Sequence, residues 1–442
     1  MKNKSLLLAV GVVALAIVAN IQLQKSTVDK SEQPMATDKI ASEYVKLTLA
    51  LGEHEAGYID AYYGPANWQE EVKTAGKSLQ DIVKEAKHLL HHLSFQIADK
   101  GNLDEVEQLR LSYLDAQLNA LIARTQMNIG DVKYNFDEET LALFNTEAPK
   151  KDWAEFQQAI DQLDQLLPGE QDTLMKLDEF RKQFIIPQDK LKPVFDVAIK
   201  ECRDRTKQHV ELLANENFEL EFVTDKPWSG YNWYKGDAYS LIQVNVELPI
   251  NISRAIDLGC HEGYPGHHTY NGLLEANLYK KRGWVEFSVY PLFSPQSLIA
   301  EGSANYGIEM AFPGDEKIKF EQQVLFPLAG LDATKAEQYE AVNKLVAKVS
   351  YAGNEVGRQY LNGEIDADKA ASLLEQYALM SPAKAKQRVK FMDTYGSYII
   401  NYNWGKDLVK NWVEKDANLS FEQKWQRFSK LLSTPRLPST LN

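Results

Sequence analysis

The chain has 442 residues, 44% of them hydrophobic, and is therefore long enough to bury a large core in one domain or in two lobes. Its formal net charge of −13 and the lack of any lysine- or arginine-rich run argue against nucleic acid as a partner, because phosphate binding requires clustered cationic side chains. The chain has 2 cysteines, Cys202 and Cys260, so we expect no disulfide framework and interpret both as small buried hydrophobic residues.

Residues 1–24 have the pattern of a signal peptide or an N-terminal anchor. Lys2 and Lys4 precede an apolar run, residues 6–19, that is short for a membrane span of about 20 residues. Cleavage after this run would place the bulky Ile17 three residues before the cut, so an uncleaved anchor stays open as an alternative. No cysteine lies near the run, which argues against a lipid anchor. We expect export to the periplasm or the cell surface, either in solution or tethered to the membrane.

Residues 25–37 are polar and without periodicity, which is typical of a linker. Residues 38–205 predict a mostly helical N-terminal half, because apolar residues recur at helical spacing over 103–122 and again over 153–167. Pro168 and Gly169 end the second of these helices. Residues 206–442 are expected to form the catalytic half.

Two stretches of strictly alternating hydrophobicity predict strands at residues 218–222 and 242–248, with an aromatic-rich loop over 227–234 between them. We therefore expect a small antiparallel sheet just before the histidine-rich segment. If the second strand borders a cleft and pairs with an extended substrate, Gln243 and Asn245 line substrate subsites. A purely structural hairpin is the alternative.

Three of the eight histidines surround one glutamate at residues 261–268, in the sequence HEGYPGHH. Imidazole is a common transition-metal ligand, and an adjacent carboxylate such as Glu262 can act as a general base. The usual zinc signature, HExxH, places two histidines on one helical face, but here Pro265 stands four residues after His261. On a straight helix His267 would lie roughly 120° from His261, and His268 about 10 Å further along the axis. A straight helix therefore cannot chelate a metal with this spacing.

Pro265 and Gly266 supply the break that this spacing requires. Pro265 has no N–H for the carbonyl of His261, and its ring clashes with the preceding turn. Gly266 permits backbone angles that are closed to other residues. We predict that the chain loops out two residues and returns His267 to the side of His261, whereas an ordinary helix–turn with a histidine-rich tip is the alternative.

A third candidate ligand, Glu301, lies in a predicted helix over residues 297–310. Catalytic zinc usually takes three protein ligands and leaves a fourth position open, which two histidines and this glutamate would satisfy. Asn305 follows one helical turn later on the same face. Apolar neighbours favour a buried Glu301, and Gly302 and Gly307 permit close approach of another helix.

The motifs HExxPGHH and EGxAxY together resemble a poorly characterised bacterial family of zincin-like domains, and are similar to gluzincin metallopeptidases. Residues 58–65 and 398–405 also resemble family segments, so the resemblance covers most of the chain after about residue 38. It implies a mainly α, zincin-like fold in which His261, His267 and Glu301 bind zinc and Glu262 is the base. His268 then becomes a residue that supports the ligands or contacts substrate. Ser303 stands where the family commonly has tryptophan, so the pocket shape is not carried over.

The predicted mechanism needs a donor for the oxyanion that forms when Glu262 deprotonates metal-activated water. Tyr398 and Tyr402, four residues apart, are candidates, and Arg388 is a further one. Core packing is the alternative reading of both tyrosines.

The sequence therefore predicts an exported zinc hydrolase that cleaves peptides. Two alternatives remain open at this stage. One is a non-catalytic scaffold whose metal shell is closed by His268, and the other is a hydrolase of non-peptide amides or esters. The oligomeric state and the choice between endo- and exopeptidase activity are not defined by the sequence.

Overall fold

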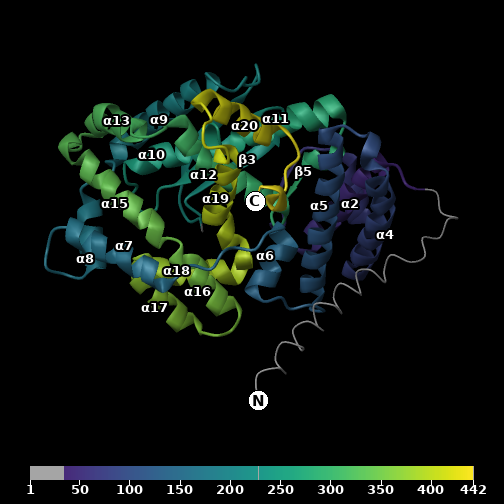
Figure 1. The fold of residues 1–442 in the computed structure, drawn as a ribbon, viewed down its shortest axis with the longest axis horizontal. Helices are drawn as coiled ribbons and strands as arrows, with labels where there is room; N and C mark the ends of the chain where they lie inside the picture. The colour runs from purple at the N-terminus through teal and green to yellow at the C-terminus, as the bar shows by residue number, and fades with distance from the viewer. Residues whose placement is uncertain (1–33, 227, 442) are drawn as a thin grey trace, which may run out of the picture.

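The protein is described here by a computed structural model, which covers residues 34–226 and 228–441. The predicted signal or anchor segment and most of the predicted linker lie outside these residues. The described chain is mainly helical with two small sheets, which confirms the predicted fold class (Figure 1). No helix in the described ranges is long and apolar enough to span a membrane.

Between residues 34 and 207 the structure forms eight α-helices and one short strand. They are α2 (Thr37–His54), β1 (Ile59–Tyr62), α3 (Asn67–Ala75), α4 (Leu79–Ala98), α5 (Glu105–Ile129), α6 (Phe136–Phe144), α7 (Trp153–Leu166), α8 (Thr173–Lys182) and α9 (Leu191–Lys207). The predicted helical stretches correspond to α5 and α7. The start of α5 is defined by a capping box, in which the Asp104 side chain accepts from the backbone N–H of Glu107 at 2.8 Å and Glu107 accepts from that of Asp104 at 3.0 Å.

The middle of the chain holds the larger sheet and the histidine-rich segment. It comprises β2 (Asn217–Val223), β3 (Gly230–Gly236), β4 (Tyr239–Asn245), α10 (Ser253–Leu258), the π-helical turn η3 (Gly259–Gly263), α11 (His267–Leu274) and β5 (Val289–Pro291). The remainder is helical: α12 (Pro295–Ala311), α13 (Glu316–Phe320), α14 (Phe326–Ala329), α15 (Ala336–Val349), α16 (Ala352–Leu361), α17 (Ala367–Ala378), α18 (Pro382–Tyr395), α19 (Ile400–Glu414) and α20 (Phe421–Ser433).

Two clusters of buried hydrophobic residues hold these elements together, and both draw on the two predicted halves of the chain. One joins α2, α4 and α5 to α11, α12 and α16–α20, and the other joins α7–α10 to α13–α15. In Figure 1, α2, α4 and α5 lie side by side on the right, α7, α8 and α15 lie on the left, and α12 and α19 run through the middle. A boundary at residue 205 therefore does not separate two cores.

The larger sheet is mixed, in contrast to the predicted antiparallel hairpin. Its strand order is β2–β4–β3, with β4 antiparallel to β3 and parallel to β2. The aromatic segment, predicted as a loop, contains most of strand β3. Asp237 and Ala238 both have positive φ (54° and 57°) and form the tight β3–β4 turn, so β2 pairs with the remaining edge of β4. As a result β4 is the central strand and β3 is an edge strand.

Helices α12 and α19 are in close contact at Gly302 and Gly405. A Cβ atom added to Gly302 would overlap the backbone carbonyl of Gly405, so no larger residue fits at this crossing. Gly307 packs in the same way against Pro265, where an added Cβ would lie 2.8 Å from the ring carbon Cγ. Gly302 therefore serves the close helix approach that its sequence position predicted, whereas Gly307 leaves room for Pro265. Helix α12 thus contacts α19 on one side and the histidine-rich segment on the other.

Cys202 and Cys260 form a disulfide, with their Cα atoms 5.5 Å apart, which corrects the prediction of two unpaired cysteines. The bond joins α9 to η3, the turn that carries His261. A separation of 58 residues gave no indication of the pairing, which arises because α9 packs directly against η3. Both cysteines are fully buried, as predicted.

Candidate metal centre

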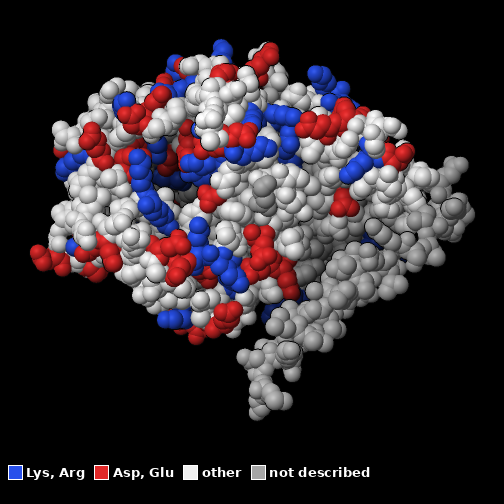
Figure 2. Space-filling model, viewed as in Figure 1, with Lys and Arg blue, Asp and Glu red and all other residues white. Residues whose placement is uncertain are grey.

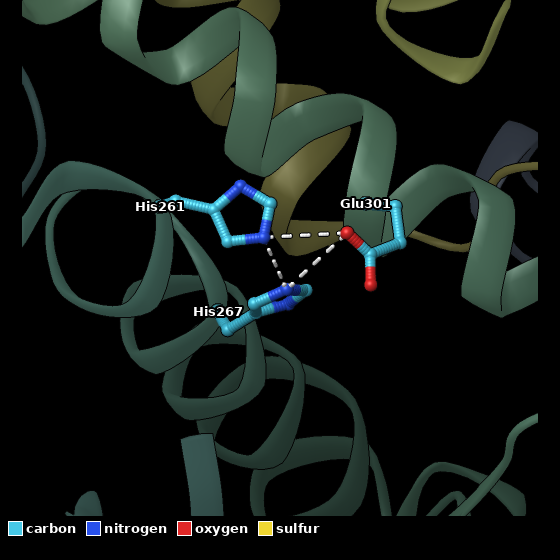
Figure 3. Close-up of side chains that lie close together, drawn as sticks. All are labelled: His261, His267 and Glu301. Carbon is cyan, nitrogen blue, oxygen red and sulfur yellow. Dashed lines mark hydrogen bonds and ion pairs between the residues drawn. The ribbon is translucent and has the colours of Figure 1, made fainter. Parts of the chain in front are cut away.

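Three side chains converge from η3, α11 and α12 to form a candidate metal site (Figure 3). The Nε2 atoms of His261 and His267 lie 3.1 Å apart. Glu301 Oε2 lies 3.3 Å from Nε2 of His261 and 3.8 Å from Nε2 of His267. The side chains are 10–13% exposed, so the site is shielded but reachable from solvent.

These distances suit a small divalent ion. Ligand atoms at about 2.0–2.2 Å from zinc in a tetrahedral arrangement lie roughly 3.3–3.6 Å from one another, close to the three distances observed. Glu301 Oε2 is fully buried and has no hydrogen-bond partner in the described chain. A buried carboxylate oxygen without a partner is costly unless a cation balances it. The residues present therefore fit a bound zinc ion.

The backbone between His261 and His267 shows how the unusual spacing works. The chain widens into the π-turn η3, and then passes through Pro265, which follows a cis peptide bond, before α11 begins at His267. Gly266 lies so close to the carbonyl oxygens of His261 and Cys260 that an added Cβ would overlap both. The glycine is thus required for space, because a Cβ cannot be accommodated beside these two carbonyl groups.

Asn305 orients the first histidine ligand. Nδ1 of His261 lies 3.1 Å from Oδ1 of Asn305, and the Asn305 amide donates to the backbone carbonyl of Tyr402 at 3.0 Å. Because the amide nitrogen is already engaged, Oδ1 accepts from Nδ1–H, which leaves the Nε2 lone pair directed at the other ligands. This contact places Asn305 in the supporting position that its sequence spacing suggested.

The two candidate tyrosines differ in what their hydroxyl groups contact. Tyr398 donates to Oε1 of Glu301 at 2.9 Å, so it holds a ligand carboxylate in place. The hydroxyl of Tyr402 has no hydrogen bond within the described residues, although its ring lies 5.8 Å from that of Tyr398. Burial and then the charge of Glu301 raise the pKa of both hydroxyls well above the ordinary value, so both stay protonated donors. Tyr402 is therefore the better candidate for an oxyanion donor.

The electrostatics of the site favour a positive charge at its centre. Burial opposes the charged form of His267, but the nearby carboxylate of Glu301 and the charges of Glu262 and Asp60 outweigh this and raise its pKa to about 9. Burial likewise opposes ionisation of Glu301, and its interactions with the two histidines lower the pKa of that carboxyl well below its usual range. In the absence of metal, a proton would thus supply the positive charge, and metal binding would release it.

Glu262, the candidate base, is buried on η3 beside strand β3. Its backbone carbonyl accepts from the Asn232 side chain at 2.6 Å, and a Cβ added to Gly230 would lie 3.0 Å from its carboxylate Oε1. The absence of a side chain at Gly230 therefore leaves room for the carboxylate of Glu262. That carboxylate has no hydrogen-bond partner in the described chain, so it is free to accept a proton.

Asp60 on β1 is a residue of the site that the sequence did not single out. The hydroxyl of Tyr231 on β3 donates to its carboxylate. Burial raises the pKa of Asp60 to about 6, against the opposing effects of the Tyr231 hydrogen bond and the charge of His267. The resemblance of residues 58–65 to a family segment pointed to this part of the chain, but it did not indicate a role for Asp60.

His268 lies outside the candidate ligand group, and its two ring nitrogens contact other side chains. Its Nδ1 lies 2.8 Å from Oγ of Ser240 and its Nε2 lies 3.2 Å from Oε2 of Glu216, which is also ion-paired with Arg203 at 2.5 Å. The side chain is 2% exposed. His268 therefore links α11 to β4 and to Glu216, and His267 is the second histidine of the candidate ligand set.

The structure removes the strand pairing from which subsite roles for Gln243 and Asn245 were predicted. Both lie on β4, whose backbone is paired on each side, so an extended substrate cannot add to this strand. Gln243 accepts from the indole N–H of Trp233 at 3.0 Å, and Asn245 donates to the backbone carbonyl of Trp228 at 3.2 Å. Their side chains stabilise the aromatic segment, whereas the neighbouring strand β3 passes beside Glu262.

Arg388 on α18 lies close enough to Tyr402 for each charge to affect the other's pKa. Its guanidinium carbon lies 5.0 Å from the ring centroid of Phe391, and its Nε is fully buried without a hydrogen-bond partner. The structure thus places Arg388 near Tyr402, so both remain candidate donors to the oxyanion.

The contrast between the two tyrosines leads to a paired prediction. Tyr398→Phe should weaken zinc affinity by about 10- to 100-fold, because Glu301 loses a hydrogen bond that orients it. Tyr402→Phe should retain zinc and lower kcat by about 100-fold or more, because the oxyanion loses a donor. Zinc titration and steady-state kinetics on both variants would separate the roles. Equal zinc affinity and full activity in both would remove the tyrosines from the site.

Fold and site together define a mainly helical protein with a His–His–Glu candidate metal centre. No family model matches the chain, and no curated protein matches its sequence. Among solved structures, the chain is similar to a candidate lipoprotein from Colwellia psychrerythraea, at 12% identity and a TM-score of 0.50, over 93% of this chain and 76% of that one. At this identity the likeness concerns the fold alone.

Two further solved structures also match. The M32 carboxypeptidase from Deinococcus radiodurans R1 has 12% identity and a TM-score of 0.45, over 88% of this chain and 87% of that one. BsuCP has 13% identity and a TM-score of 0.45, over 90% of this chain and 88% of that one.

Proposed function

We propose that the protein is an exported zinc-dependent hydrolase that cleaves peptide bonds. The observation that carries the proposal is the buried Oε2 atom of Glu301, which has no hydrogen-bond partner and faces the Nε2 atoms of His261 and His267. A bound zinc ion supplies Lewis acidity, which acidifies water and polarises a carbonyl group. Because His268 is engaged by Ser240 and Glu216, the protein offers three ligands, which favours a catalytic site over a closed structural one.

Side chains of the protein carry out proton transfer, oxyanion stabilisation and positioning of the ligands. Glu262 takes a proton from water and delivers it to the leaving amine. Tyr402 donates a hydrogen bond to the oxyanion, while Tyr398 and Asn305 hold Glu301 and His261 in position. Strand β3 has one unpaired backbone edge and passes beside Glu262, so it is the strand that can pair with an extended peptide.

Export is supported by the N-terminal signal-like pattern and by the disulfide between Cys202 and Cys260. Disulfides persist in oxidising compartments such as the periplasm and are rare in the cytosol. The signal-like pattern and the disulfide lie in separate parts of the chain, and both support export.

Metal analysis combined with a peptide assay tests the proposed function. Purified protein should contain close to one zinc per chain and should hydrolyse members of a mixed peptide library. Chelation should abolish hydrolysis, and added zinc should restore it. Zinc at full occupancy without hydrolysis of any peptide or of amide and ester model substrates would instead support the scaffold alternative. No bound metal, even after zinc is supplied, would overturn the proposal.

A further inference from the structure

The two candidate histidine ligands lie on different helical elements, so no single helix fixes their relative position. His261 lies on the π-helical turn η3, whereas His267 is the first residue of α11. In the usual HExxH arrangement one straight helix carries both histidines, and its backbone hydrogen bonds set the distance between them. In this protein other contacts must hold the two histidines together.

Cys260 is connected to both histidines through the backbone. It directly precedes His261 in the chain, and its carbonyl oxygen accepts a hydrogen bond of 3.0 Å from the N–H of Gly266, the residue before His267. A Cβ atom added to Gly266 would overlap this oxygen, so the two backbone segments are in direct contact. The position of Cys260 therefore affects where both imidazole rings lie.

The disulfide with Cys202 attaches Cys260 to helix α9. Gly259, the residue before Cys260, packs against the same helix, where an added Cβ would lie 3.5 Å from Cα of Ile199. The turn η3 is thus in contact with the backbone of α9 and is covalently joined to it one residue further on. The bond therefore ties the start of the ligand segment to a helix outside the candidate site.

The disulfide also closes a loop that contains the whole of the larger sheet. Strands β2, β3 and β4 all lie between Cys202 and Cys260 in the chain. Strand β3 borders the candidate base, because Asn232 donates to the backbone carbonyl of Glu262 at 2.6 Å. One covalent bond thus joins the helix before the sheet to the turn after it, and this turn carries both the base and the first histidine ligand.

The disulfide lies in the core, out of reach of solvent. Cys202 and Cys260 are both 0% exposed, and they belong to the buried cluster that joins α7–α10 to α13–α15. Figure 2 shows Lys, Arg, Asp and Glu side chains on the surface over α9 and α13, whose places are labelled in Figure 1. An oxidant can therefore reach the two thiols only while the chain is not yet folded, so oxidation accompanies folding.

We propose that the Cys202–Cys260 disulfide positions both histidine ligands, so that the metal centre gains its full zinc affinity only when the two thiols are oxidised. The inference rests on the proposed function and adds a regulation of the same site. In the oxidation both thiols lose their protons and form the S–S bond, and two electrons pass to a disulfide oxidant, which becomes a dithiol. The cytosol keeps thiols reduced, whereas the periplasm is oxidising. The peptidase therefore acquires its activity after export.

The zinc affinity of the double variant Cys202→Ala/Cys260→Ala tests the positioning role. Competition with a chromogenic chelator should give a zinc dissociation constant about 10- to 100-fold higher than that of native protein, the range for groups that orient metal ligands. The visible spectrum of bound Co²⁺, which reports the geometry of the ligands, should change as well. A disulfide that only stabilises the fold would lower the melting temperature and leave both metal readouts unchanged.

Ile82→Ala is the matched control for lost stability. Ile82 is fully buried on α4, which packs against α2 and α5 and contributes no residue to the candidate metal centre. The cavity should lower the melting temperature, whereas the zinc affinity and the Co²⁺ spectrum should stay native. Circular dichroism at the assay temperature would show that the control and the double variant are folded.

Native protein in its two redox states gives a test without any substitution. The chain is unfolded with a phosphine reductant and refolded either with the reductant present or with oxidised glutathione. Titration of free thiols after denaturation should find the 2 cysteines in the reduced form and none in the oxidised form. The reduced form should bind zinc about 10- to 100-fold more weakly, and oxidation should restore native affinity. Equal zinc affinity of the two folded forms would overturn the proposal.

Zinc binding and peptide hydrolysis together separate this proposal from the proposed function. A difference in zinc affinity between oxidised and reduced protein, without hydrolysis of any peptide, would support the positioning role and reject the peptidase. Hydrolysis with equal zinc affinity in both forms would reject the positioning role and support the peptidase. Protein that binds no zinc in either form would reject both.

Discussion

Glu262→Gln should lower kcat for peptide hydrolysis by about 100- to 10,000-fold and leave zinc content unchanged. Glutamine has nearly the same shape but cannot accept the proton of water, so the loss is that of general-base catalysis. The fold should be retained, because the contact that holds this residue, between its backbone carbonyl and Asn232, does not involve the carboxylate. Initial rates on the best library peptide, with zinc content measured on the same preparation, would show the effect.

Glu309→Gln is the matched control for this experiment. Glu309 lies on α12 like Glu301, but its carboxylate is paired with Lys406 at 2.5 Å and Lys410 at 2.6 Å, away from the ligands. This variant should keep both zinc and activity. Activity close to native in Glu262→Gln would show that another group takes the proton, and the assignment of the base would have to be withdrawn.

His267→Ala should lose most of the bound zinc, from near one ion per chain to less than about a tenth under the same conditions. One nitrogen of a three-ligand set is removed, and the remaining two ligands cannot hold the ion against dilution and chelation. Hydrolysis should disappear with the metal. Mass spectrometry of metal content, before and after dialysis against a weak chelator, measures this directly.

His268, the next residue in the chain, provides a matched control for His267. His268→Ala should keep zinc, because its ring contacts Ser240 and Glu216 behind the site. It should instead lower the free energy of unfolding by about 1–3 kcal/mol, since it leaves buried polar partners unsatisfied. Thermal or urea unfolding would record the loss. The reverse pattern, with zinc lost from His268→Ala and kept by His267→Ala, would contradict the ligand set.

Local chemistry indicated His261 and Glu301 as candidate ligands and favoured His267 over His268 as the third. Pro265 standing four residues after His261 rules out a straight chelating helix, and a break at Pro265 and Gly266 is the local solution. The structure realises that break through the π-turn η3 and the close approach of Gly266 to two carbonyl groups. The glutamate could be selected because apolar neighbours and two glycines indicated a buried helix in close contact with another.

Long-range pairing made the surroundings of the ligands unpredictable. The alternation at residues 242–248 indicated a strand, but not that β4 would be central, because the β3–β4 turn at Asp237 lies in a segment without a clear pattern. The Cys202–Cys260 disulfide depends on α9 packing against η3. Asp60 reaches the site because β1 lies beside β3. No charge pattern in the sequence around Asp60 indicates this contact.

The sequence by itself determined the mainly helical fold class and indicated His261 and Glu301 as candidate ligands with Glu262 as a candidate base, because periodicity and ligand spacing are local properties of the chain. Only the tertiary structure decided which of His267 and His268 joins these two residues, which tyrosine contacts Glu301, and which strand borders Glu262. Each of these depends on contacts between residues far apart in the chain, and such contacts are decided by how the helices pack rather than by any pattern along the sequence.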